Sequence, residues 1–117
     1  MTVQAFYQAV GGNYEEVMSR LMTEQRVMKY LRKLPQSDDV AQMNLAFDQG
    51  RWEEAFRFSH NVKGMALNLS LTVLAAAASD LCETVRNGPP TVDFLPLLVD
   101  VNGKYQIFLD ALAQLEG

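Results

Sequence analysis

The side chains best suited to chemistry lie in the stretch Ser59-His60-Asn61-Val62-Lys63-Gly64, which holds the only histidine of the 117 residues. On a helix, residues three and four positions apart share a face, so Lys63 and Gly64 are the next-turn neighbours of His60. The imidazole is a nucleophile, the ammonium group can neutralise incoming oxygens, and a glycine leaves room for close approach. Glycine costs roughly 1 kcal/mol in a helix interior relative to alanine, so its presence needs a reason. The three residues predict a landing site for a phosphoryl group.

A helix over residues 51–69 must position these side chains. At 100° per residue, one broad face of this helix holds its core-type residues: Trp52, Ala55, Phe58, Ser59, Val62, Met65, Ala66 and Leu69. His60 lies roughly 140° from the centre of that face, and Gly64 lies almost opposite it. We therefore expect His60 to face solvent, where another protein can reach it, whereas a buried structural histidine would suit position 59 or 62.

Two apolar residues of the same helix lie beside His60 rather than towards the core. Phe56 is four residues before it and Leu67 is seven residues after it. An exposed apolar rim next to a reactive group is typical of a docking surface, so Phe56 and Leu67 are candidate partner-binding residues. The alternative is that another helix of the same chain covers them.

The motif His60-x-x-Lys63-Gly64, followed by Asn68-Leu69 and a helix rich in alanine and leucine, resembles the histidine phosphotransfer (HPt) domains of bacterial multistep phosphorelays. The resemblance is strongest over residues 46–86. Outside that range, the first 35 and the last 25 residues match the family only in helical character.

A second motif supports this resemblance. Asp48-x-Gly50-x-Trp52 is similar to the turn that precedes the histidine helix in the HPt family. The sequence also departs from the family pattern at two positions: Ser70 stands where glycine is frequent, and Met65 where a smaller residue is frequent. These departures concern the shape of the site rather than the nucleophile.

The resemblance implies an activity with His60 as the phospho-acceptor. His60 would accept a phosphoryl group from a phosphorylated receiver domain and pass it to a response regulator, and Lys63 and Gly64 would stabilise and admit the group. The chain would be a phosphocarrier without kinase activity of its own and without a cofactor, because the Mg²⁺ would belong to the partner receiver domain. A hybrid sensor histidine kinase is a second partner that the resemblance implies.

Other functions fit the sequence less well. Phosphoryl transfer needs charge neutralisation, yet the chain has neither a Walker-type glycine loop nor an acidic cluster around His60 to hold magnesium. Sensor kinases have an acidic residue after the histidine and a proline soon afterwards, whereas Asn61 follows here. A metal site is not expected, because His60 and Cys82 lie 22 positions apart. Two alternatives stay open: a helical adaptor that carries no phosphate, and an HPt fragment of a hybrid sensor kinase.

Helical periodicity runs through the rest of the chain and predicts an all-α fold. We expect helices at 3–10, from Asn13 to residue 34 with a possible break at Thr23, at 38–49, 71–87 and 93–115. Pro35 should end the second run, and Ser37 should cap the helix after it. The resemblance adds an antiparallel, up-down four-helix bundle with additional short N-terminal helices. The predicted organisation is a single domain, 1–117, with N-terminal helices at 1–35 and a bundle core at 36–117.

Composition restricts the partners and the location. A net charge of −4 argues against nucleic acid, which requires a basic face. No apolar run approaches the roughly 20 residues of a membrane span, and the N-terminus lacks the features of a signal peptide. The single cysteine, Cys82, fits a reducing compartment and is expected to be buried. We therefore expect a cytoplasmic protein, and we expect a monomer.

Overall fold

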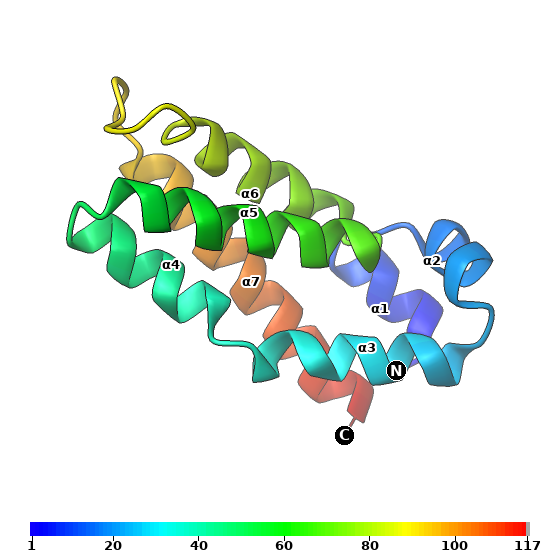
Figure 1. Cartoon of the computed structure of the whole chain (residues 1–117). Helices are drawn as coiled ribbons and strands as arrows, with labels where there is room; N and C mark the ends of the chain where they lie inside the picture. Colours follow the sequence, from blue (N-terminus) through cyan, green and yellow to red (C-terminus); the bar gives the residue numbers. More distant parts are fainter. Residues whose placement is uncertain (117) are drawn as a thin grey trace.

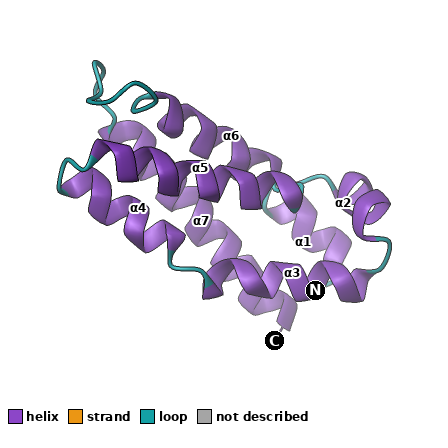
Figure 2. Ribbon diagram, viewed as in Figure 1, coloured by secondary structure: helices purple, strands orange, loops and turns teal. Residues whose placement is uncertain are grey.

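All regular secondary structure within the described residues, 1–116, is helical in the computed structural model of the chain (Figure 2). The helices are α1 (Val3–Ala9), α2 (Tyr14–Leu21), α3 (Glu24–Gln36), α4 (Asp39–Asp48), α5 (Trp52–Asn68), α6 (Thr72–Glu83) and α7 (Leu95–Glu116). The predicted all-α fold class is confirmed. The predicted domain runs one residue further, to 117, and that last residue lies outside the described residues.

The helix that carries His60, α5, lies between α4 and α6 and packs against both (Figure 1). The long helix α7 packs against α6 and then continues to α1 and α3. The short helix α2 packs against α1 and α3. As a result, α7 joins the N-terminal helices to the group that surrounds α5.

One apolar core holds these helices together. Its largest fully buried side chains come from α1, α3, α4, α6, α7 and the turn after α5, among others: Phe6, Tyr7, Leu31, Met43, Phe47, Leu71, Leu81 and Phe108. Burying such a side chain contributes about 1.5–3 kcal/mol, so this cluster supplies the main stabilisation. Cys82 is 1% exposed, which confirms that it is a buried residue.

Several helix ends lie where the sequence signals place them. The Asn13 side chain accepts a hydrogen bond from the Glu16 amide at 3.0 Å and caps α2, and the Thr23 hydroxyl caps α3. At the end of α4, Gly50 has φ +68°, and the Arg51 amide donates to the Ala46 carbonyl at 2.9 Å. This is the Schellman pattern that a C-terminal glycine predicts.

The predictions for the boundary between α3 and α4 were wrong by one or two residues. Pro35 lies inside α3, which ends at Gln36 rather than Leu34. The proline removes one amide donor, but it does so in the final turn, where little of the hydrogen-bond ladder remains. The N-cap residue of α4 is Asp38. Ser37 lies one position before it, and its hydroxyl accepts a hydrogen bond from the Asp39 amide at 3.1 Å.

The predicted helix at 71–87 is also too long, because α6 ends at Glu83. Beyond it, the Val85 amide donates to the Cys82 carbonyl, and the Gly88 amide donates to the Val85 carbonyl. These bonds span three residues instead of four, so the chain tightens into turns and leaves the α-helix. Residues 84–94 form the connection that projects from one end of the molecule (Figure 2).

Candidate functional site

The frame of the site is α5, which is one residue shorter at each end than the predicted 51–69. Glu53 and Glu54 lie in its first turn, where the helix dipole favours negative charge. Its buried residues are Ala55, Ser59, Val62 and Ala66. The Ser59 hydroxyl donates to the Ala55 carbonyl at 2.6 Å, so this polar group has a partner inside the core.

His60 is exposed to solvent, as the helical wheel predicts. The neighbouring positions 59 and 62 are fully buried, so the wheel separates the imidazole from the core correctly. One turn further along, a Cβ atom added to Gly64 would meet no atom within 4 Å. The helix surface beside His60 is therefore open at Gly64, and no side chain of the described chain packs there.

The two predicted rim residues differ in exposure. Leu67 is 51% exposed, so about half of its side chain is open to solvent. Phe56 is partly buried and packs against the core, and its ring centroid lies 5.7 Å from that of His60 with an interplanar angle of 39°. Phe56 is therefore a direct neighbour of the imidazole, while Leu67 is a free apolar side chain on the same helix.

Comparison with known proteins decides the family. A family model of the Hpt domain matches residues 36–116, which is more than half of the chain. The chain belongs to the Hpt domain family. Membership indicates a histidine phosphotransfer role in phosphorelay signalling. No curated protein and no solved structure matches the chain. The range of this Hpt domain that matches the family model includes α4–α7, while α1, α2 and nearly all of α3 precede it.

The structure of this Hpt domain adds Arg86 to the surroundings of His60. The guanidinium carbon lies 5.5 Å from the ring centroid of Phe56, so Phe56 contacts both His60 and Arg86. Arg86 also donates from Nε to both carboxylate oxygens of Glu83, at 3.0 and 3.1 Å. The sequence shows the three-residue spacing of Glu83 and Arg86, but it could not show that Arg86 crosses to Phe56.

Lys63 lies on the side of α5 that faces α6, where it lines a surface hollow together with Ala75 and Ser79 of α6. The hydrogen bonds from Arg86 hold the pKa of the Glu83 carboxyl below its usual value, and the charge of Lys63 acts in the same direction. Burial raises the pKa of the Cys82 thiol, against the opposing effects of Ser59 and Lys63. Lys63 is thus within electrostatic reach of α6, on the helix that carries the histidine.

The C-terminal end of α5 is held by residues that precede the family match. Arg20 donates from Nη2 to the carbonyls of Leu67 and Asn68, each at 3.0 Å, and also to the Ser70 hydroxyl. The Tyr7 hydroxyl donates to the Leu69 carbonyl at 2.7 Å. A guanidinium at a helix C-terminus satisfies free carbonyls and balances the negative end of the dipole. Burial raises the pKa of Tyr7, so its phenol remains a donor in neutral solution.

Replacing Arg20 with methionine should lower the free energy of unfolding by about 1–2 kcal/mol, because two carbonyls of α5 lose a charged donor. Urea denaturation followed by circular dichroism measures this change. Arg26→Met is the matched control, since Arg26 is exposed on α3, and its effect should stay within about 0.5 kcal/mol. Equal stabilities of the two variants would contradict the capping role of Arg20.

Two further findings concern what the described residues contain. Within residues 1–116, no group of three or more His, Cys, Asp or Glu side chains is placed to hold a metal ion. None of the helices in that range is both long enough and apolar enough to cross a membrane.

Proposed function

We propose that His60 accepts a phosphoryl group from the aspartyl phosphate of a receiver domain and passes it to a response regulator. The observation that carries this proposal is the position of His60: the only histidine is exposed on α5, inside the residues that match the Hpt domain, beside the open surface at Gly64. Transfer in both directions uses the same site, because the nucleophile and the leaving group exchange roles.

The proposed reaction is an in-line displacement at phosphorus. A neutral imidazole nitrogen of His60 forms the N–P bond while the bond from phosphorus to the aspartyl oxygen of the receiver breaks, and the carboxylate leaves with the electron pair. Positioning and charge neutralisation dominate such transfers. The receiver domain would supply Mg²⁺, Lys63 would balance charge on the phosphoryl oxygens, and Gly64 would admit them.

The proposal also assigns a part to the rest of the chain. The helices α4–α7 would form the up-down four-helix unit of the Hpt domain, with 1–35 as additional helices of the same single domain. The protein would act as a cytoplasmic monomer without kinase activity of its own, and a hybrid sensor histidine kinase would be a second partner. The family match over 36–116 and the position of α5 between α4 and α6 support this division.

Incubation with a panel of phosphorylated receiver domains tests the proposal. We expect an acid-labile phosphate on the chain, which mass spectrometry under neutral conditions should map to His60. An adaptor that carries no phosphate would bind a receiver without becoming labelled. Labelling of the chain by ATP alone, without a receiver or a kinase, would contradict the assignment of the catalytic apparatus to the partner.

Phe56 and Leu67 should contribute to docking, while Lys63 should contribute to chemistry. We expect Phe56→Ala or Leu67→Ala to weaken binding of the cognate receiver by about 1–2 kcal/mol, because binding energy concentrates in a few apolar anchors. Lys63→Ala should instead lower the transfer rate at saturating receiver. Titration calorimetry and single-turnover transfer separate the two effects.

Ile107 provides the matched control for these substitutions. It is an apolar residue of α7 with 48% exposure, close to the 51% of Leu67, but it lies on a different helix. Ile107→Ala should leave receiver binding unchanged. The docking assignment is wrong if Ile107→Ala weakens binding as much as Leu67→Ala does, or if the Phe56 and Leu67 variants lose stability without losing affinity.

A further inference from the structure

The helix α3 differs in charge from the rest of the chain. It holds four of the ten Lys and Arg residues but only one of the 14 Asp and Glu residues, in a chain whose net charge is −4. Arg32, one of the four, pairs with Glu116 at 2.7 Å. The other three, Arg26, Lys29 and Lys33, have no carboxylate within salt-bridge distance in the part of the chain that the structure describes.

These three cations share one face of α3 with Tyr30. Their positions, 26, 29, 30 and 33, follow the spacing that places side chains in one row along a helix. All four residues are exposed, and Tyr30 has 39% exposure. The ammonium groups of Lys29 and Lys33 lie 5.8 and 5.0 Å from the centroid of the Tyr30 ring. We call this row, Arg26, Lys29, Tyr30 and Lys33, the basic stripe.

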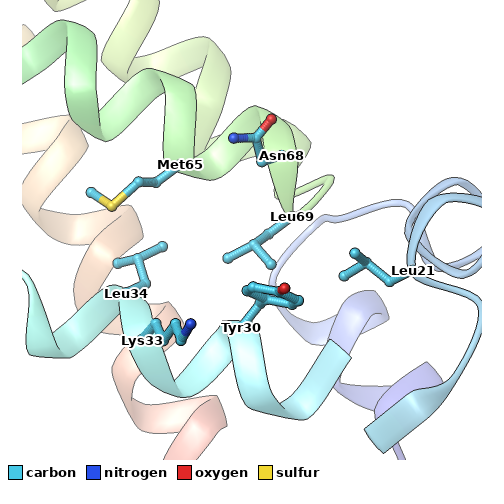
Figure 3. Close-up of a pocket in the computed structure, with 7 residues that line it drawn as sticks. All are labelled: Leu21, Tyr30, Lys33, Leu34, Met65, Asn68 and Leu69. Carbon is cyan, nitrogen blue, oxygen red and sulfur yellow. The ribbon is translucent and has the colours of Figure 1, made fainter. Parts of the chain in front are cut away.

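An apolar groove adjoins the basic stripe. It has a volume of about 350 Å³ and lies between α3, the end of α5 and α2 (Figure 3). Leu34 and Leu69 are buried residues of its lining, and Leu21 and Met65 extend the apolar surface. Tyr30, Lys33 and Asn68 supply the polar groups of the lining, and Tyr30 and Lys33 belong to both the groove and the stripe. The cations and the apolar surface are thus continuous.

We propose that the basic stripe and the groove bind an acidic segment of a partner protein, which places one apolar side chain between α3 and α5. Three unpaired cations spread over eight residues of helix, roughly 10 Å, match several carboxylates on an extended chain better than one small anion. The groove is concave, so it receives an apolar group, whereas a membrane surface would require protruding apolar residues. At such an interface, most of the binding energy usually comes from a few buried anchor residues, which are surrounded by polar and charged groups.

This surface is separate from the proposed phosphoryl site. The basic stripe lies on residues that precede the family match at 36–116, and only Met65, Asn68 and Leu69 of the groove belong to the end of the histidine helix and its cap. A segment bound here would leave the imidazole of His60 unblocked. The interaction therefore does not depend on phosphoryl acceptance, and it can hold even if the proposed transfer fails.

A labelled model peptide tests the proposal directly. The probe is a fluorescein-tagged peptide of about ten residues, alternating glutamate and serine with one central leucine, a length that spans the stripe in extended form. Fluorescence anisotropy should show saturable binding to the full chain. Binding should weaken roughly tenfold from about 0.1 M to about 1 M NaCl, because the Debye length falls from about 10 Å to about 3 Å.

Two sets of variants distinguish the stripe from general electrostatics. Lys29→Glu combined with Lys33→Glu should weaken binding at least about tenfold, while Lys104→Glu, a charge reversal of half that size on α7, should have little effect. Replacing the central leucine of the peptide with serine should weaken binding by roughly fivefold, because the groove loses its anchor. The His60→Gln variant should bind the peptide as the unaltered chain does.

Several outcomes would overturn the proposal. Equal losses in the stripe variant and in Lys104→Glu would mean that any cation suffices, and equal affinity for the leucine and serine peptides would remove the groove from the site. No binding of the peptide would reject the acidic segment. Stripe-dependent binding to anionic phospholipid vesicles, without peptide binding, would assign the surface to a membrane instead. Circular dichroism of each variant verifies that a loss of binding is not a loss of fold.

Discussion

Replacing His60 with glutamine should abolish phosphoryl acceptance from any phosphorylated receiver domain while leaving the helical circular dichroism spectrum unchanged. The imidazole is the only one in the chain, and glutamine offers an amide nitrogen that does not attack phosphorus. Because His60 is exposed, its loss removes no core contact, and the free energy of unfolding should change by no more than about 0.5 kcal/mol.

Receiver binding provides the control for this variant. His60→Gln should still bind the receiver, since Phe56 and Leu67 remain in place, and titration calorimetry can verify this. Loss of labelling without loss of binding identifies His60 as the acceptor. If an acid-labile phosphate still forms on the glutamine variant, the assignment of His60 as the acceptor is wrong, and the same mass spectra would identify the true acceptor.

Replacing Gly64 with valine should slow phosphoryl transfer by more than about tenfold, because small displacements at a reacting centre carry large rate penalties. A Cβ at this position meets no atom within 4 Å, so the variant can fold without a clash. Valine also has a higher helix propensity than glycine, so stability should rise by a few tenths of a kcal/mol. Single-turnover transfer from a phosphorylated receiver measures the rate.

Gly103 makes this test specific. It lies inside α7, and a Cβ added there also meets no atom within 4 Å. Gly103→Val should therefore raise stability by a similar amount without any effect on transfer. If Gly64→Val transferred as fast as the unaltered chain, the open surface beside His60 would have no role in the reaction, and the glycine would need another explanation.

The exposure of His60 could be predicted from the sequence because one regular helix was enough to decide it. Once α5 is a helix, its apolar residues fix the buried side, and the orientation of His60 follows from 3.6 residues per turn. The same reasoning located Gly64, and the exposure of Leu67 agrees with it. Helix ends that depend on one local residue could also be predicted, such as the start of α2 at Asn13 and the end of α4 before Gly50.

Features that depend on two distant segments could not be predicted in this way. The contact of Arg20 with the end of α5 joins residues 47 and 48 positions apart, and Arg86 reaches Phe56 from the turns that follow α6. The groove beside the basic stripe combines α2, α3 and α5. Helix ends were missed where opposing tendencies are close in energy: Pro35 is tolerated in a final turn, and the chain after Glu83 tightens although its residues permit a longer helix.

The position of α7 limits how far this molecule can be treated as an exchangeable module. Phe6 of α1 and Phe108 of α7 are both buried, and their rings meet edge to face with centroids 5.9 Å apart. The family match begins at residue 36, but the apolar core continues across that boundary into the helices that precede it. A fragment cut at residue 36, or a chimera that grafts only the matched part onto another protein, would open one side of Phe108 to water. We therefore expect that a unit moved between proteins intact must be larger than the Hpt match and include α1–α3.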